Sequence, residues 1–95
     1  MKNKYYIYIL SGASDIVQIG VTKDPEQMLH EQTEKLDESF LDADLVSKVV
    51  YLEKWDDRFI AGAREEQLRH LSRKQLVKLV EQQNPEWNDL LKISA

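Results

Sequence analysis

Two runs of β-forming residues, separated by a short turn cluster, begin the chain and constrain its fold more than any other feature. The first run, Tyr5–Leu10, is continuous in tyrosine, isoleucine and leucine, and the second, Ile16–Thr22, alternates apolar and polar residues. Such runs, bounded by glycine, serine and aspartate, are typical of a β-hairpin. If the hairpin folds about Ala13, Tyr8 lies across from Gln18, and we expect this pair to lie near any functional site.

The length and composition of the chain limit what it can be. With 95 residues and no cysteine, the sequence predicts one domain, 1–95, without disulfides, thiolate zinc sites or cysteine nucleophiles. The apolar run near the N-terminus is too short and too rich in tyrosine for a signal peptide, and nothing approaches the ~18 apolar residues of a membrane span. These features favour a cytoplasmic protein that does not contact a membrane.

The net charge of −4 is unevenly distributed along the sequence. Residues 24–46 hold eight acidic side chains against Lys35, which gives −7, whereas residues 1–23 sum to +2 and residues 47–95 to +1. An acidic block of this kind repels phosphate backbones, which proteins usually neutralise with lysine and arginine. The ordinary interpretation is a solvated helix and loop. The alternatives are a surface for a basic partner, for self-association or for mimicry of nucleic acid.

Capping residues and apolar spacing predict the remaining elements. The predicted elements are a helix opened by Asp24-Pro25 and running to about Lys35, a strand over 46–54, a helix over 58–70 with Asp57 as its N-cap, a helix whose capping box begins at Ser72, and a last short helix opened by Asn84-Pro85. The apolar stripe expected for the 58–70 helix is Ile60, Ala61, Ala63, Leu68 and Leu71. The sequence therefore predicts an α+β domain in the order ββαβααα, with a small three-stranded antiparallel β-sheet flanked by helices.

Four blocks of sequence occur in an order and at a spacing that resemble a known family. Tyr6-Ile7-Tyr8 is followed, ten residues after Tyr8, by Gln18-Ile19-Gly20, and a strand at 49–53 comes next. Residues 61–68 read Ala-Gly-Ala-Arg-Glu-Glu-Gln-Leu, and residues 84–90 read Asn-Pro-Glu-Trp-Asn-Asp-Leu. Together these blocks resemble the GIY-YIG nuclease superfamily, and in particular its small stand-alone bacterial members, over nearly the whole chain.

The resemblance implies a mechanism for cutting one DNA strand. In that family tyrosine hydroxyls position or deprotonate a water molecule, an arginine neutralises the phosphate, and a glutamate holds Mg²⁺ or Mn²⁺. Such groups stabilise the charge that develops on oxygen in the transition state. The resemblance places the first tyrosine at Tyr8 and the metal glutamate at Glu65.

Three of the family positions depart from the pattern. The second tyrosine falls on Gln18, the helix arginine on Met28, and a histidine or tyrosine one turn later on Gln32. Losing one charge-stabilising donor costs about 10²–10³ in rate, and losing an acid–base group about 10²–10⁴. We therefore expect a domain with impaired catalysis that acts as a binding module. The alternative is a residual metal-dependent DNA endonuclease that uses Tyr8 and Glu65.

The second half of the sequence contributes candidate contact residues. Arg64, Arg69, Arg73 and Lys74 form a locally basic region that is suited to nucleic acid or an acidic protein partner, although it is also typical of an ordinary exposed face. Asn84 is either a site residue or a helix cap. The partners expected from the sequence are DNA, disfavoured by the acidic 24–46 segment, or a protein.

Overall fold

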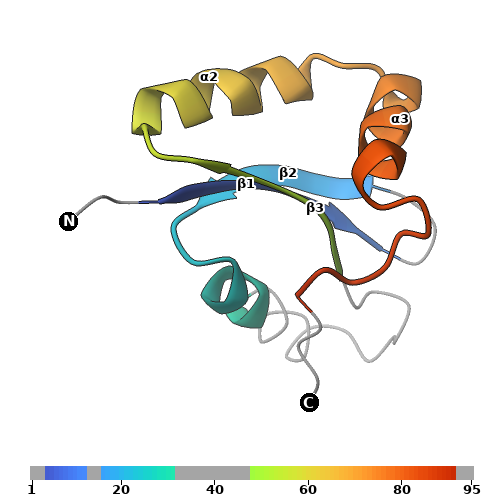
Figure 1. The fold of residues 1–95 in the computed structure, drawn as a ribbon, viewed down its shortest axis with the longest axis horizontal. Coiled ribbons are helices and arrows are strands. Elements are labelled where there is room, and N and C mark those ends of the chain that lie inside the picture. Colours follow the sequence, from blue (N-terminus) through green and yellow to red (C-terminus); the bar gives the residue numbers. More distant parts are fainter. Residues whose placement is uncertain (1–3, 13–15, 32–47, 92–95) are drawn as a thin grey trace.

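The computed structural model describes residues 4–12, 16–31 and 48–91 (Figure 1). A three-stranded antiparallel sheet forms the centre of this part of the chain, with strand order β2-β1-β3. The strands are β1 (Tyr5–Ser11), β2 (Ile16–Thr22) and β3 (Lys48–Trp55). β1 is the most apolar of the three and takes the central position, where both faces are covered. The predicted three-stranded antiparallel sheet is confirmed.

The hairpin register differs from the expectation by two residues. Tyr8 lies directly opposite Gly20, and Gln18 lies opposite Leu10. From Tyr6 to Leu10, each β1 residue thus lies opposite a β2 residue two positions later than expected. The register then shifts between Leu10 and Ser11. Gln18 is therefore the diagonal neighbour of Tyr8, a position from which a long side chain still reaches across a strand pair.

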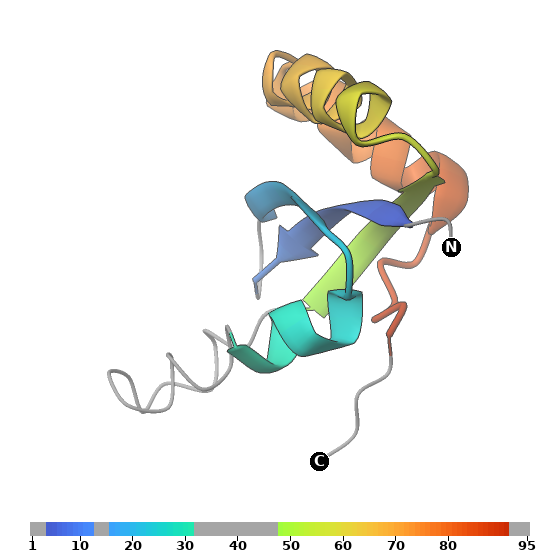
Figure 2. The ribbon, with the colours of Figure 1, turned by 90° about the vertical axis from the view of Figure 1, so that its left-hand side faces the viewer.

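Helices cover both faces of the sheet. One helix begins at residue 25 and is described as far as residue 31, and it packs on the face opposite to α2 (Arg58–Arg69) and α3 (Arg73–Gln83) (Figures 1 and 2). Two apolar clusters result. The cluster beneath α2 and α3 consists of Ile7, Ile9, Val50, Tyr51, Leu68, Leu76 and Val80, and the cluster beneath the 25–31 helix consists of Tyr8, Leu10, Met28, Leu29 and Val49.

The helices begin at the caps that the sequence predicts. A side-chain oxygen of Asp24 accepts a hydrogen bond from the Gln27 backbone N–H, and one of Asp57 accepts from the N–H groups of Phe59 and Ile60. Ser72 and Gln75 exchange the two hydrogen bonds of a capping box. Each cap satisfies N–H groups that have no partner within the helix.

The closing segment, for which the sequence predicted a last short helix, forms a turn at 85–86 instead. Its groups bond to the outer edge of β3. The Leu90 N–H donates to the Val49 carbonyl, the Asn84 amide donates to the Val50 carbonyl, and the Gln83 amide pairs with both backbone groups of Leu52. Covering a sheet edge in this way satisfies strand groups that would otherwise attract another chain.

Part of the sequence interpretation falls on residues outside the described ranges. Gln32 and most of the acidic segment, residues 32–46, belong to this part, so the roles assigned to them stay predictions. Within the ranges that the structure describes, no helix has the length and apolar character needed to cross a membrane.

Candidate functional site

Tyr8 is the centre of the candidate site. Its side chain extends from β1 toward the 25–31 helix and is 5% exposed. The amide Nε2 of Gln18 donates a hydrogen bond to the phenol oxygen over 3.1 Å. Beneath the ring lies Gly20, where a Cβ atom would come within 2.6 Å of the Tyr8 Cζ. The expected proximity of Tyr8 and Gln18 is thus confirmed, and Gly20 provides the space that the ring needs.

The surroundings of Tyr8 raise the pKa of its phenol. Burial is the main cause and raises the pKa of Tyr8 above its ordinary value of 10.0, and the charge of Glu65 adds to the increase. The hydrogen bond from Gln18 and the charge of Arg69 oppose it more weakly. A phenol in this state accepts or donates hydrogen bonds at neutral pH but does not act as a base.

Met28 packs in the same apolar cluster as Tyr8, from the 25–31 helix. It is 9% exposed and belongs to the apolar cluster that contains Tyr8 and Leu29. Its thioether carries no charge and is at most a weak hydrogen-bond acceptor. The structure places Met28 in the same cluster as Tyr8, where its side chain contributes packing rather than a group that could bind phosphate.

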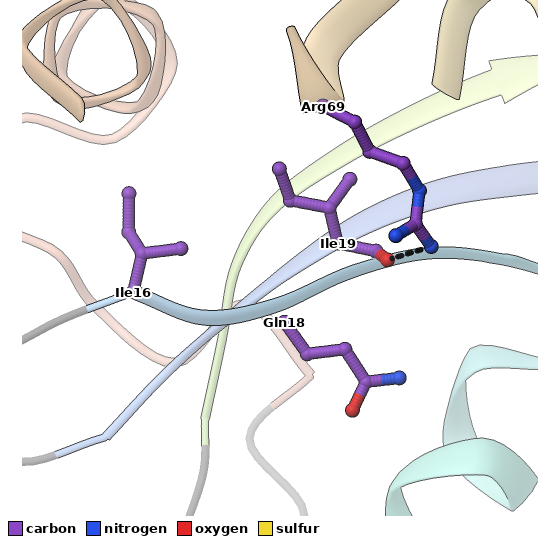
Figure 3. Close-up of a pocket in the computed structure, with 4 residues that line it drawn as sticks. All are labelled: Ile16, Gln18, Ile19 and Arg69. Atoms are coloured by element: carbon purple, nitrogen blue, oxygen red, sulfur yellow. Dashed lines mark hydrogen bonds between the residues drawn. The ribbon is translucent and has the colours of Figure 1, made fainter. Parts of the chain in front are cut away.

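Glu65 and Arg69 lie on α2 and reach the outer edge of β2. Their side chains form an ion pair over 3.1 Å, and Arg69 also donates to the Ile19 carbonyl over 2.9 Å. Figure 3 shows Arg69 and Ile19 on one side of β2 and Gln18 on the other. Together with Ile16, these three residues line a surface pocket of about 320 Å³.

This arrangement brings some of the predicted site residues together. Tyr8, Gln18 and Met28 lie together on the face of the sheet that the 25–31 helix covers. Glu65 lies on α2, which covers the other face, and it meets the edge of β2 through its ion pair with Arg69. The role of Arg69 in bridging Glu65 to β2 was not foreseen, although the Glu-to-Arg spacing of four residues on a helix could have indicated the ion pair.

The described residues do not fit a divalent metal at Glu65. No group of three or more histidine, aspartate or glutamate side chains occurs within the ranges that the structure describes. Glu65 supplies one carboxylate, and a guanidinium already neutralises it. Mg²⁺ and Mn²⁺ prefer several oxygen ligands, so a metal here would have to displace Arg69 and rely largely on water.

The remaining basic candidates have different surroundings. Arg64 binds the carboxylate of Glu53 over 2.9 Å, so the positive charge of Arg64 is neutralised within the fold. Arg73 and Lys74 are exposed in the first turn of α3. Arg64 and Arg69 are thus held by intramolecular ion pairs, and the predicted basic face retains less free positive charge than the sequence indicates.

Asn84 acts in the fold rather than at the site. It is 4% exposed and forms the C-cap of α3. Its amide nitrogen donates to the carbonyls of Val50 and Asn88, and its oxygen accepts from the Asn88 N–H. The side chain is therefore fully bonded at the β3 edge, which is the opposite edge of the sheet from Gln18.

No model of a protein family matches the chain, and neither the curated proteins nor the solved structures contain a similar sequence or fold at a significant level.

Proposed function

We propose that this chain is a GIY-YIG-like domain that binds a partner without cleaving DNA efficiently. The observation that supports the proposal is the environment of Tyr8. A neutral amide occupies the position expected for a second phenol, and a thioether occupies the position expected for a guanidinium. Neither group can take up a proton or offset the charge of a phosphodiester transition state.

The charges around the site favour the same proposal. Among the residues predicted to contact a partner, Arg69 is the cation that lies at this edge of the sheet. It is already bound to the carboxylate of Glu65 and to the backbone carbonyl of Ile19. A phosphate would have to compete with both partners for it. We therefore propose a protein as the partner, with nucleic acid as a weaker one. We also propose a cytoplasmic location, with which a sequence free of cysteine is compatible.

The alternative is a residual endonuclease that uses Tyr8, Glu65 and Mg²⁺ or Mn²⁺. The presence of Tyr8 and Glu65 at the two family positions favours it. It requires Arg69 to release Glu65, so that the carboxylate becomes available to a cation. Once bound, the cation would supply the positive charge that Met28 lacks.

A DNA-nicking assay separates the two functions. Supercoiled and branched DNA are incubated with the full chain and either Mg²⁺ or Mn²⁺, and nicks are counted against a metal-free reaction. We expect no nicking above that background. Nicking by the parent chain that disappears in Glu65→Ala, but persists in the control Glu66→Ala, would establish the endonuclease and overturn the proposal.

Restoring the missing groups gives a second measurement. The Gln18→Tyr/Met28→Arg variant should nick DNA at least about tenfold faster than the parent, because it regains a phenol and a phosphate-binding cation. Because position 28 is buried, the fold of this variant is checked by circular dichroism, and Gln18→Tyr alone, at an exposed position, serves as the folded reference. A folded double variant without any gain would show that the site does not have nuclease geometry.

A further inference from the structure

The two edges of the sheet differ in how their backbone groups are bonded. At the outer edge of β3, the Gln83 side chain bonds to both backbone groups of Leu52, and the closing segment bonds further along. The outer edge of the sheet on the other side is β2. An edge strand that is not covered presents N–H and C=O groups that pair readily with another extended chain.

The strand pairing identifies the groups of β2 that point outward. Leu52 directs its N–H and C=O away from β1, so the residue opposite to it, Tyr8, directs its own toward Gly20 of β2. In an antiparallel ladder this direction alternates along the strand. The next pair, Ile9 with Ile19, is therefore not hydrogen-bonded between β1 and β2, and the N–H and C=O of Ile19 point out of the sheet.

Arg69 occupies one of these outward groups. Its Nη2 donates to the Ile19 carbonyl over 2.9 Å, as an outward-facing carbonyl allows. Val21, two residues further along β2, has the same backbone direction as Ile19. Within the described part of the chain, no other hydrogen bond reaches the outward groups of Ile19 or Val21. A strand that pairs with β2 must therefore replace Arg69 at the Ile19 carbonyl.

The surface pocket of about 320 Å³ follows this edge. Arg69 and Ile19 line it from one side of β2 and Gln18 from the other (Figure 3). The pocket thus extends around the edge of the strand and does not lie over a single face. An added strand, whose side chains alternate between the two faces, fits a space of this form.

We propose that the outer edge of β2 binds an extended acidic segment of a partner protein as an antiparallel strand, with a glutamate of that segment opposite Ile19. This inference names the partner of the proposed binding function and rests on that function. Residues opposite each other share a face, so the glutamate side chain lies on the side of Arg69. Its N–H takes the Ile19 carbonyl, and its carboxylate accepts the N–H that Arg69 releases. The exchange leaves neither group without a partner, whereas a neutral segment would leave the guanidinium without its second acceptor.

The position of Arg69 favours such a segment over a second copy of the chain. Pairing two β2 strands antiparallel requires a two-fold axis perpendicular to the sheet, which sets both α2 helices on the same side of the junction. The Arg69 side chains of both copies would then lie over one junction, where like charges repel. An acidic segment brings the opposite charge to the same place.

Titration of the full chain with synthetic peptides, followed by the backbone amide resonances in NMR, tests the proposal. The probe is the capped peptide Thr-Val-Thr-Glu-Thr-Val-Thr, and its control has glutamine in place of glutamate. The acidic peptide should bind with a dissociation constant of about 0.1–1 mM and shift the amides of Ile19 and Val21 most, and the glutamine peptide should bind about tenfold more weakly.

Methylation of the peptide backbone tests the strand pairing without altering the protein. A methyl group on the glutamate nitrogen removes the N–H that the Ile19 carbonyl needs, and it should abolish the shifts. A methyl group on the nitrogen of the next threonine, whose N–H points away from β2, should weaken binding less than about threefold. Equal losses with the two methylated peptides would overturn the antiparallel pairing.

Substitution of Arg69 tests the role of its charge. Arg69 has a half-exposed side chain, and Arg69→Ala should bind the two unmethylated peptides within about twofold of each other, because the group that distinguishes them is gone. Lys74→Ala, which removes an exposed cation from α3, should keep the tenfold difference. The amide spectrum of each variant reports whether it folds.

Three results would overturn the proposal. They are amides of Ile19 and Val21 that do not respond to about 5 mM peptide, equal affinities of the parent for both peptides, and shifts of these amides with protein concentration alone, which would assign the edge to a second copy. The nicking assay measures the proposed function separately, because peptide binding neither requires nor prevents DNA cleavage. A failed titration without nicking would therefore remove only the acidic strand as the partner.

Discussion

The guanidinium of Arg64 binds the carboxylate of Glu53 through one nitrogen, with Nε 2.9 Å from Oε1 and 3.2 Å from Oε2. The Tyr51 hydroxyl and the Trp55 indole N–H each donate to the same carboxylate over 2.6 Å. These bonds connect β3 to α2 on the face of the sheet opposite to Tyr8. The Glu53 side chain is 18% exposed, so its carboxylate is largely removed from water. Each of the three donors would lose a hydrogen-bond partner without it.

We expect Glu53→Gln to lower the free energy of unfolding by about 2–4 kcal/mol, because Arg64 would be left partly buried without its counter-charge. Urea unfolding followed by circular dichroism measures the change. Glu66→Gln, which alters an exposed carboxylate on α2, should change the free energy by less than about 0.5 kcal/mol. Equal effects of the two substitutions would contradict a special role for Glu53.

The stabilisation by Glu53 should depend on pH. Burial by itself would raise the pKa of Glu53, but the hydrogen bonds from Arg64, Tyr51 and Trp55 outweigh it and lower the pKa below the ordinary value of 4.5. The unfolded chain therefore binds this proton more readily than the native one. The stabilisation is present above pH 4.5 and is lost as the pH falls through the lowered pKa. The stability difference between the parent and Glu53→Gln should shrink in urea titrations below this pH, and a constant difference would contradict the prediction.

Gly20→Ala should destabilise the fold by about 1–3 kcal/mol, because its methyl group would overlap the ring of Tyr8. Gly62→Ala is a matched control. Its methyl group meets no atom within 4 Å, and alanine in a helix is favoured over glycine by about 0.5–1 kcal/mol, so it should stabilise the chain. In a Tyr8→Ala background Gly20→Ala should cost much less. If the cost is unchanged there, the ring is not its cause.

Asn84→Ala should cost about 2–4 kcal/mol, because the Val50 carbonyl would lose its donor at a buried position and the closing segment would lose its anchor. Asn88→Ala is the control, since the contacts between these two asparagines use only the backbone of Asn88. Its effect should be below about 1 kcal/mol. Thermal unfolding of both variants measures the difference, and similar midpoints would show that the amide of Asn84 does not hold the segment.

Removing the amide of Gln18 should raise the pKa of Tyr8 further, because its hydrogen bond opposes the effect of burial. Gln18→Leu is expected to move the midpoint of the Tyr8 ring resonances in an NMR pH titration, which separates Tyr8 from Tyr51 and the other tyrosines, to higher pH. Gln27→Leu serves as the control, because the side chain of Gln27 bonds Glu31 and does not reach Tyr8. A shift to lower pH, or equal shifts in both variants, would be inconsistent with the hydrogen bond between Gln18 and Tyr8.

The parts that sequence reasoning predicted correctly depend on neighbouring residues. Asp24, Asp57 and Ser72 cap helices because their side chains reach backbone N–H groups two or three residues away. The prediction for Ile60, which is 50% exposed, was wrong because helical spacing marks an apolar stripe without saying which part of it the sheet covers. The segment after Asn84-Pro85 forms a turn and not the predicted helix, because the Leu90 N–H and the Asn84 amide bond to carbonyls at the edge of β3.

The order of the three strands and of the helices as far as α3, the helix caps and the residue types at the family positions were determined by the sequence alone, since each follows from local propensity and composition. The tertiary structure decided the strand register, the burial of Met28 beside Tyr8 and the bond from Arg69 to the Ile19 carbonyl. These depend on contacts between segments up to 50 residues apart, such as Arg69 with Ile19. Only the packed chain brings such groups within hydrogen-bond distance, and that packing buries Tyr8 and raises the pKa of its phenol.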